Sequence, residues 1–344
     1  MNVNNFQSTA LGMTFIRRHT FFLIQAIFAC TPMSCITVSF AQSISWPSKP
    51  VRIVIPVPPG GSQDTLARAM AVDLARIWGQ PVLVESRPGA GGVTAAAAVA
   101  QSPGDGYTIL MTDEMSMTVT PLLHRKLSYD TARDFSAVLA LVQASSIVVV
   151  PAASTINTVV DLIAEARARP GTVNYGSWGI GSATHLSTES FAAQVGISMT
   201  HVPYKGGADV LRALLSNEVQ VAFTGLTATI PAIRQGRLKA IAYAGPSRPQ
   251  LLPEVPTIGE SGVPGFYARG WLGWLVPSST PRAIVGKIAA DAGRVISAAA
   301  FTEKYVTAVG FEVYNLPMEQ FEQMLSTSRT RMDAELKRLR LQAE

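Results

Sequence analysis

The sequence predicts an α/β protein built from two lobes. From Trp46 onward, short apolar runs typical of strands alternate with segments whose apolar residues recur at helical spacing. The same alternation starts again near Ile147. The chain has 344 residues, which exceeds one ordinary domain and suffices for two. Because strand and helix alternate, we expect largely parallel sheets flanked by helices.

The first half is expected to begin with a strand over 51–57. The helix that follows carries Leu66, Met70, Leu74 and Ile77 on one stripe and stops at Gly79. The remaining elements expected here are a strand over 81–85, a glycine-rich turn over 87–92, an alanine-rich helix over 93–101 and a strand over 107–111.

The second half repeats this pattern. The elements expected there are strands over 147–150, 173–175, 199–202, 219–223 and 238–244, and helices over 159–168, 185–195 and 210–215. Residues 245–266 are rich in proline and glycine and are expected to form a long loop. A strand over 271–276 and helices over 281–299 and 317–341 complete the chain.

The N-terminal segment predicts export. Arg17 and Arg18 precede an apolar stretch over 21–40 without a charged residue, and the stretch ends on small residues in the spacing that precedes signal-peptide cleavage. We therefore expect a signal peptide over 1–41 and a periplasmic mature protein. Pro32 interrupts the stretch, which disfavours a membrane-spanning anchor.

Both cysteines lie inside this segment. Lipidation at Cys30 is not expected, because Phe28 is bulky where acylation sites carry a small or β-branched residue. Cleavage after Ala41 would remove Cys30 and Cys35 together. The mature protein would then have no catalytic thiol, thiolate metal site or disulfide.

Composition excludes several classes of protein. Hydrophobic residues make up 48% of the chain and charged residues 15%, the opposite of a disordered protein. Without Arg17 and Arg18, 26 basic residues face 23 acidic ones, a formal charge of +3. Because this balance is nearly even and the basic residues are scattered, we expect no nucleic-acid partner.

The first candidate site is the loop that joins the first strand to its helix. Pro58, Gly60, Gly61 and Ser62 lie there. Glycines let backbone N–H groups approach a ligand closely, and a helix N-terminus adds partial positive charge, so such a loop can bind a carboxylate. Asp64 is expected to cap the helix, since its charge would repel an anion. A plain tight turn is the alternative.

The second candidate is the loop before the helix expected over 185–195. Its candidate contacts are Ser177, Trp178, Gly179, Gly181 and Ser182. Gly179 and Gly181 resemble the start of a dinucleotide-binding fingerprint, but Thr184 stands at the third glycine position, so no nucleotide cofactor is expected. Because the two loops occupy equivalent places in the two halves, two helix N-termini could hold one anion from both sides.

The titratable residues predict neither a metal site nor a catalytic centre. The histidines that remain after export, His124, His185 and His201, lack the spacing of a zinc site. His185 and Ser182 could form a nucleophile–base pair, but no acidic partner or nucleophile elbow accompanies them, and structural hydrogen bonding is the expected role of His185. Asp113 and Glu114 are expected to cap a surface turn, with a ligand ammonium group as the alternative.

Taken together, the motifs resemble those of the substrate-binding receptors of tripartite tricarboxylate transporters, the Bug or TctC family. The matching stretches are Trp46-Pro47-Ser48-Lys49-Pro50-Val51-Arg52, residues 58–64 with Ala67-Arg68, residues 87–92, 105–108, 128–130, 134–135, 179–186, 201–206, 252–257, 265–266 and 271–273. They follow one another in order from about Trp46 to the C-terminus.

The resemblance implies a type II periplasmic binding fold whose lobes are joined by two crossovers. Lobe 1 would comprise 46–146 and 267–344, and lobe 2 would comprise 147–266. A carboxylate would be held in the cleft between the two glycine-rich loops and passed to a membrane permease, with hinge closure, no cofactor and no enzymatic step. A monomer is expected. The alternatives are a solute sensor that feeds a signalling partner and a hydrolytic enzyme.

Three departures from the family pattern bear on the ligand. Thr224 stands where an aspartate usually follows Phe223, and Trp178 occupies a loop position that is usually small. Asp113 and Glu114 add acidity to a loop that is commonly neutral. The indole would be a wall that shortens the site, a platform for a flat acid, or a side chain packed on its own lobe.

Overall fold

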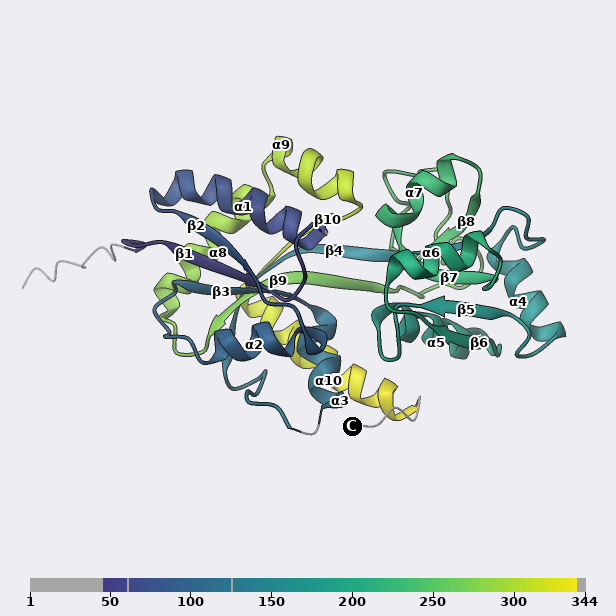
Figure 1. Ribbon diagram of the computed structural model, residues 1–344, viewed down its shortest axis with the longest axis horizontal. Helices are drawn as coiled ribbons and strands as arrows, with labels where there is room; N and C mark the ends of the chain where they lie inside the picture. Colours follow the sequence, from purple (N-terminus) through teal and green to yellow (C-terminus); the bar gives the residue numbers. More distant parts are fainter. Residues whose placement is uncertain (1–45, 61, 125, 339–344) are drawn as a thin grey trace, which may run out of the picture. The chain divides into compact units, whose positions relative to one another are not determined.

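The computed structural model describes residues 46–60, 62–124 and 126–338 (Figure 1). The expected signal peptide, with Cys30 and Cys35, lies outside these residues, as does the candidate Gly61. Within the described ranges, no helix combines the length and apolar character needed to cross a membrane.

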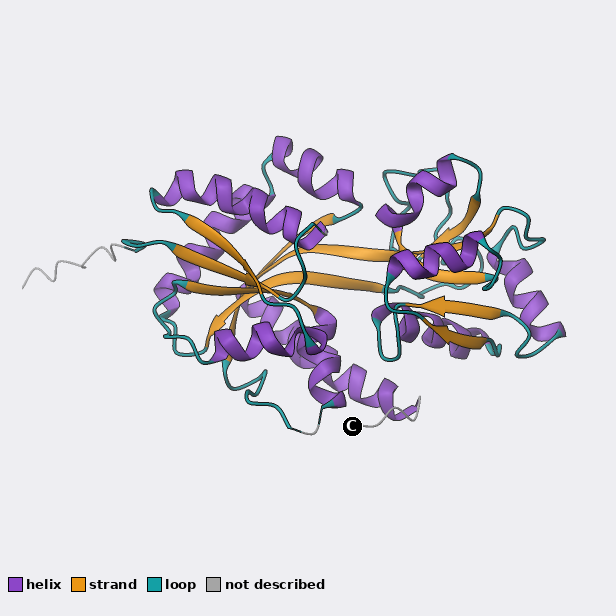
Figure 2. Ribbon diagram, viewed as in Figure 1, coloured by secondary structure: helices purple, strands orange, loops and turns teal. Residues whose placement is uncertain are grey.

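Ten strands and ten α-helices make up the described chain (Figure 2). The strands are β1 Val51–Ile55, β2 Val82–Ser86, β3 Thr108–Asp113, β4 Phe135–Pro151, β5 Asn174–Ser177, β6 Thr200–Pro203, β7 Val221–Gly225, β8 Leu238–Tyr243, β9 Arg269–Pro277 and β10 Glu312–Pro317. The helices are α1 Ser62–Trp78, α2 Val93–Ala100, α3 Thr120–Leu123, α4 Val159–Ala168, α5 Ala183–Val195, α6 Gly207–Leu215, α7 Leu226–Arg234, α8 Arg282–Ile296, α9 Ala299–Phe301 and α10 Met318–Arg338. Shorter turns are η1 Ala90–Gly92, η2 Met115–Val119, η3 Thr302–Val306 and η4 Thr307–Val309.

The strands form one hydrogen-bonded series in the order β2-β1-β3-β9-β4-β7-β5-β6, with β10 and β8 also paired to β4. Strands β1, β2 and β3 run parallel, as do β5, β6 and β7. In contrast, β9 is antiparallel to β3 and β4, and β4 is antiparallel to β7, β8 and β10. The expectation of largely parallel sheets is therefore wrong for the pairs made by β4 and β9. These pairs are antiparallel because β4 leaves the first half of the fold and β9 returns to it in the opposite direction.

Strand β4 connects two α/β lobes. Its first part, up to Ser145, pairs with β9, and its residues from Ser146 pair with β7. We call β1–β3, β9, β10 and the first part of β4 the first lobe, and β5–β8 with the rest of β4 the second lobe. Figure 2 shows β4 and β9 as the long strands that run between them.

Each lobe has its own apolar core. In the first lobe, α1 packs Leu66, Met70, Leu74 and Trp78 into the core. Ile77, expected on this buried stripe, is 40% exposed, because the stripe drifts to Trp78 in the last turn. In the second lobe, buried aromatic rings meet around Phe191, whose centroid lies 5.3 Å from that of Phe223 and 5.5 Å from that of Phe266.

Helix α10 contacts both lobes. Its first half buries Phe321 and Leu325 in the first lobe, where Phe321 meets Trp271 edge-to-face with 4.8 Å between centroids. Near its end, Leu336 joins a separate cluster with Val119 of η2 and Leu186 of α5. Leu186 belongs to the second lobe, so this cluster links the two lobes through side chains.

Candidate functional site

Both candidate loops lie where parallel strands end. In the first lobe, α1, η1 and η2 follow the carboxyl ends of β1, β2 and β3. In the second lobe, α5, α6 and α7 follow the carboxyl ends of β5, β6 and β7. Ligands of α/β proteins bind outside the carboxyl ends of the strands, where helix N-termini gather. The chain therefore presents such an edge in each lobe.

The first loop, residues 58–62, is exposed at Pro58, Gly60 and Ser62. Gly60 has a φ of 97°, a left-handed conformation that favours glycine, and its N–H donates to Asp64 Oδ2 over 3.0 Å. Asp64 also pairs with Arg68, and this bond holds the pKa of the carboxyl below its usual range. Asp64 occupies the third residue of α1 instead of the expected N-cap, and its carboxylate fastens the loop to the helix.

Helix α1 begins at Ser62, so the N–H groups of its first turn, including those of Ser62 and Gln63, have no partner within the helix. The Gln63 side chain is buried and donates to the carbonyl of Met111 over 3.0 Å. The helix start is thereby tied to the end of β3. Ser62 at the helix start is exposed, while the Gln63 side chain beside it is buried and occupied.

The turn over 87–92 packs against η2. A β-carbon at Gly92 would lie 2.5 Å from Ser116 Oγ, so only glycine fits there. Ser116 is held by Asp113, which accepts from the Ser116 N–H over 2.9 Å and from its hydroxyl over 3.2 Å. Burial raises the pKa of Asp113 against these bonds. Asp113 thus binds the second residue of η2, while the N-cap position belongs to Glu114, whose side chain makes no capping bond. Sequence patterns do not reveal Ser116 as the partner of Asp113.

Glu114 differs from its expected place at a surface turn. Its side chain is buried and pairs with Arg331 of α10 over 2.9 Å. Burial raises the pKa of Glu114, and the Arg331 guanidinium opposes that rise. Arg331 lies 217 residues away along the chain, a separation that hides the pair from sequence patterns.

The second loop, residues 177–182, uses most of its own backbone donors. The N–H groups of Trp178, Gly179, Gly181 and Ser182 donate to Thr184 Oγ1, Ser177 Oγ, His185 Nδ1 and the Gly179 carbonyl, respectively. Gly179 and Gly181 have φ values of 121° and 75°. These glycines shape the loop. Backbone N–H groups without a partner in the helix come directly after the loop, in the first turn of α5.

Those free donors are in the first turn of α5. Ser182 is the N-cap, and its hydroxyl accepts from the His185 N–H over 3.3 Å. The N–H groups of Ala183 and Thr184 lack a partner within the helix by the geometry of a helix start. The hydroxyls of Ser182 and Thr184 lie 3.1 Å apart. The second loop therefore ends on the half-buried Ser182 hydroxyl and Ala183 N–H, with Thr184 buried behind them and its hydroxyl bonded to the Trp178 N–H.

Trp178 packs on its own lobe and also reaches solvent. Its Nε1 lies 3.3 Å from Thr224 Oγ1, and its ring lies against the positions where Gly207 and Gly225 would carry β-carbons. Its exposed fraction is 39%. The loop position is thus filled by an indole that is anchored along one edge. Ile180 beside it is 68% exposed.

Gly181 joins the second loop to the first lobe. A β-carbon built there would lie 2.8 Å from Leu123 Cδ1, at the end of α3. Leu123 packs against the cluster of Val119, Leu186 and Leu336. The second loop therefore lies against the segment that follows the carboxyl end of β3.

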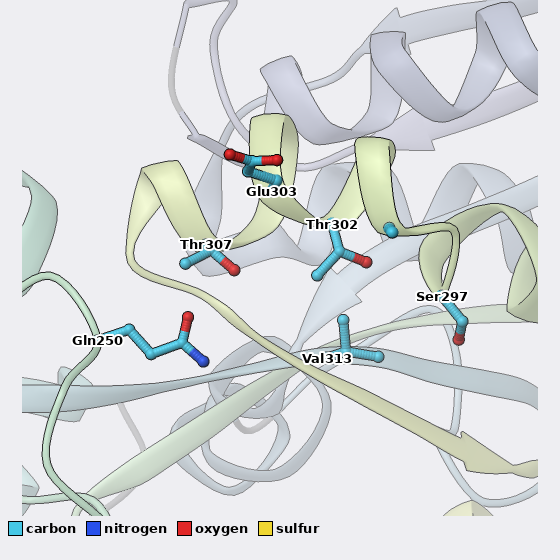
Figure 3. A pocket seen from close by; sticks show the side chains of 7 residues that line it. Gln250, Ser297, Thr302, Glu303, Thr307 and Val313 are labelled. Carbon is cyan, nitrogen blue, oxygen red and sulfur yellow. The ribbon is translucent and has the colours of Figure 1, made fainter.

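Two open hollows of the described chain lie elsewhere. One, of about 490 Å³, is shown in Figure 3 and is lined by Gln250, Ser297, Ala299, Thr302, Glu303, Thr307 and Val313. The other, of about 520 Å³, lies between α4, the end of α5 and residues 261–264. Neither contains a residue of the two loops. In residues 46–60, 62–124 and 126–338, no three His, Cys, Asp or Glu side chains gather as metal ligands would.

Comparison with known proteins identifies relatives of this chain in sequence and in structure. Residues 66–341 match the family described as tripartite tricarboxylate transporter family receptor. BugT of Bordetella pertussis is 34% identical over 254 residues, which cover 72% of this chain and 78% of BugT. The structure of R. palustris Rpa4515 with adipate is 32% identical with a TM-score of 0.75, and the match covers 85% of this chain and 97% of that one.

A second solved structure supports the same assignment. MatC from Rhodopseudomonas palustris with bound malate is 27% identical with a TM-score of 0.71, and the match covers 84% of this chain and 99% of MatC. The family match spans most of the chain, and the two α/β lobes have the periplasmic-binding-protein fold of these structures. The chain belongs to the tripartite tricarboxylate transporter receptor family.

Proposed function

We propose that this chain is a periplasmic receptor that captures a small carboxylate between the first and second loops and delivers it to a membrane permease. Family members are receptors, and the relatives solved with adipate and malate carry dicarboxylates. On this proposal residues 1–41 are a signal peptide, 46–146 with 267–344 form lobe 1, and 147–266 form lobe 2.

The observation that carries the proposal is the pair of helix starts at α1 and α5. Each leaves backbone donors without helical partners at the carboxyl end of a strand, and the Gly181–Leu123 contact brings the second loop to the first lobe. Two such N-termini stabilise an anion through hydrogen bonds and their dipoles. Pro58, Gly60, Gly61 and Ser62 would contribute from the first loop.

The residues of the second loop would have different roles. Ser182 would offer its hydroxyl to the ligand and Trp178 its exposed ring. Ser177, Gly179 and Gly181 would shape the loop, because their polar groups bond within it. The first-turn N–H groups of Ala183 and Thr184 would supply the backbone donors.

A hydrolase that uses the serine–histidine pair of Ser177 and His201 is disfavoured by the burial of Ser177. Ser177 Oγ lies 2.6 Å from His201 Nε2, a distance that suits a nucleophile and its base. However, Ser177 is fully buried, and its hydroxyl also contacts Gly179. A substrate carbonyl could not approach it without opening the loop. A sensor that reports the same ligand to a signalling partner would use the same lobes.

A thermal-shift screen tests the proposed ligand class. The panel contains adipate, malate, citrate, benzoate, glutamate and, as a non-carboxylate control, glucose. A ligand that binds only the folded state adds about 2.7 kcal/mol of stability at a hundredfold excess over Kd. We expect at least one carboxylate to raise Tm in a concentration-dependent way while glucose does not. A panel without any such acid contradicts the proposal.

A proline variant tests the site itself. Ala183 is the first residue of α5, where proline is tolerated but removes the N–H, and Ser182 before it has the extended conformation that a proline requires. Ala183→Pro should keep the fold and weaken binding of the acid found in the screen. Arg282→Pro makes the same change at the start of α8 and should leave binding unchanged.

A further inference from the structure

Three rings form a stack beside the second loop. The ring of His201 on β6 lies between Tyr175 of β5, at 4.9 Å between centroids, and His185 of α5, at 4.0 Å. The planes of the two imidazoles differ by only 9°. Each imidazole makes a hydrogen bond to the second loop, His185 to Gly181 and His201 to Ser177. The stacked rings therefore support the loop from below.

His185 supplies a hydrogen-bond acceptor. Its Nδ1 lies 3.1 Å from the N–H of Gly181, which donates to it. A ring nitrogen that accepts carries no proton, so the proton of neutral His185 lies on Nε2. Gly181 has a φ of 75° and contacts Leu123, so this bond holds the loop at the point where it meets the first lobe.

His201 acts on the other end of the loop. Its Nε2 lies 2.6 Å from Ser177 Oγ, a length typical of a hydroxyl donor and shorter than a usual N–H donor bond. Ser177 Oγ in turn accepts from the Gly179 N–H over 3.1 Å. The Gly179 carbonyl, at 3.1 Å, is a second acceptor for the single proton of the Ser177 hydroxyl. Because the contact with His201 is the shorter one, we assign this proton to the bond with His201 Nε2, which then carries no proton of its own.

We propose that His185 and His201 are positioning residues of the second loop, that both hold it through neutral acceptor nitrogens, and that acidification releases it. The effect on a carboxylate rests on the proposed function, since the loop would present the first turn of α5 to that ligand. Protonated His185 has no acceptor for the Gly181 N–H. Two protonated rings 4.0 Å apart would also repel each other.

Two charged residues, Glu189 and Arg338, lie beside the stack. Glu189 of α5 accepts from the Tyr175 hydroxyl, and its backbone carbonyl accepts from Arg338 of α10 over 3.5 Å. Burial lowers the pKa of His201 to about 4, helped by His185 and opposed by Glu189. Burial likewise lowers the pKa of His185. A depressed histidine pKa favours the folded loop above the ordinary value near 6.5, and this contribution is lost as pH falls from about 6.5 toward 4.

Nitrogen NMR of the full chain tests the proposal without any ligand. At pH 7.5 we expect His185 to carry its proton on Nε2 and His201 to carry its proton on Nδ1. On acidification, the Gly181 amide resonance should move with the same midpoint as the His185 ring. A proton on His185 Nδ1 at neutral pH, or a Gly181 amide that ignores the His185 titration, overturns the proposal.

Two variants of one residue separate the acceptor from the stacking. His185→Asn places an amide oxygen near the former Nδ1 and does not titrate, whereas His185→Phe keeps a stacked ring and loses the acceptor. With adipate at pH 7.5, Kd should stay close to wild type in H185N and rise about tenfold in H185F, the scale of one lost hydrogen bond to a buried donor. Equal Kd values in both variants would contradict a role for the acceptor.

The pH dependence of the Kd for adipate gives a further test. Adipate itself titrates, but it does so equally in every variant, so the ratio of the wild-type Kd to that of H185N isolates the histidine. This ratio should rise as pH falls from 7.5 toward 4 and should reach at least the roughly tenfold loss expected for H185F. A constant ratio overturns the proposal. If adipate and malate bind no variant, the ligand class is wrong, while the NMR titration still decides how the loop is held.

Discussion

Gly181 lies directly against Leu123, so that a β-carbon at Gly181 would stand 2.8 Å from Leu123 Cδ1. The two residues come from different lobes and from segments 58 positions apart in the sequence. Their contact fixes how near the second loop comes to the residues after β3. The site proposed for a carboxylate depends on this closeness.

Substitution of Gly181 measures that contact. Gly196 at the end of α5 is the matched control, because its φ of 66° resembles the 75° of Gly181 while no atom lies within 4 Å of its added β-carbon. Gly196→Ala should cost about 1 kcal/mol for the left-handed backbone alone. Gly181→Ala should cost more, because Leu123 must also move.

Urea unfolding gives both free energies of unfolding. Adding Leu123→Ala to Gly181→Ala should recover part of the difference between the two glycine variants, measured against Leu123→Ala alone. Equal losses at Gly181 and Gly196, with no coupling to Leu123, would mean that the two lobes do not touch at this point in solution.

Trp178 should set the acid preference of the site. Its ring is anchored at Thr224 yet 39% exposed, so we expect it to act as a platform for a flat acid. Trp178→Ala should weaken the binding of aromatic acids by about 1 kcal/mol, the scale of an aromatic pair. Trp178→Phe, which keeps a ring but loses the Thr224 bond, should retain part of that preference. Stronger binding of longer acids by Trp178→Ala would indicate a wall instead, and an unchanged profile would show that the indole only packs on its lobe.

Asp113 should make the protein less stable as pH rises. Its pKa is raised by burial, so its contribution is present below the ordinary value near 3.8 and is lost as pH rises through the folded value. Asp113→Asn should therefore have a higher Tm than wild type at pH 7, and the two should converge near pH 3.

Asp130→Asn is the control of opposite sign. Backbone bonds from Arg133 and Ala132 lower the pKa of Asp130, so its contribution is present above the ordinary value and is lost at low pH. This variant should be less stable than wild type at pH 7. Melting curves from pH 3 to 7 check both, and a lower Tm for Asp113→Asn at pH 7 would refute the expected sign.

The sequence predicted the local elements well where their signals are local. The helix expected over 159–168 matches α4. Thr158 and Asp161 cap its N-terminus with a reciprocal pair of side-chain hydrogen bonds. The two candidate loops fall where they were expected, each between a strand and a helix. His185 makes a structural hydrogen bond, as expected, and its partner is the Gly181 N–H.

The features that the sequence missed depend on distant partners. Strand β4 was expected only over 147–150, yet it begins at Phe135, because its first part is stabilised by β9 more than a hundred residues later. Strand β10 and the Glu114–Arg331 pair are equally non-local. The His201–Ser177 bond arises because β5 and β6 are neighbours in the sheet, which periodicity cannot reveal. Helix α7 was missed as well, and it contains Pro231, a residue that usually signals a helix end.

The most direct test of the whole account is an amide NMR titration of the chain with adipate. We predict that resonances of the first turn of α1, Ser62 to Asp64, and of the first turn of α5, Ala183 and Thr184, shift together and saturate at one Kd. That result places one carboxylate ligand between two helix N-termini. Saturable binding whose shifts gather around the hollow at Thr302 and Val313, or in one loop alone, would contradict it.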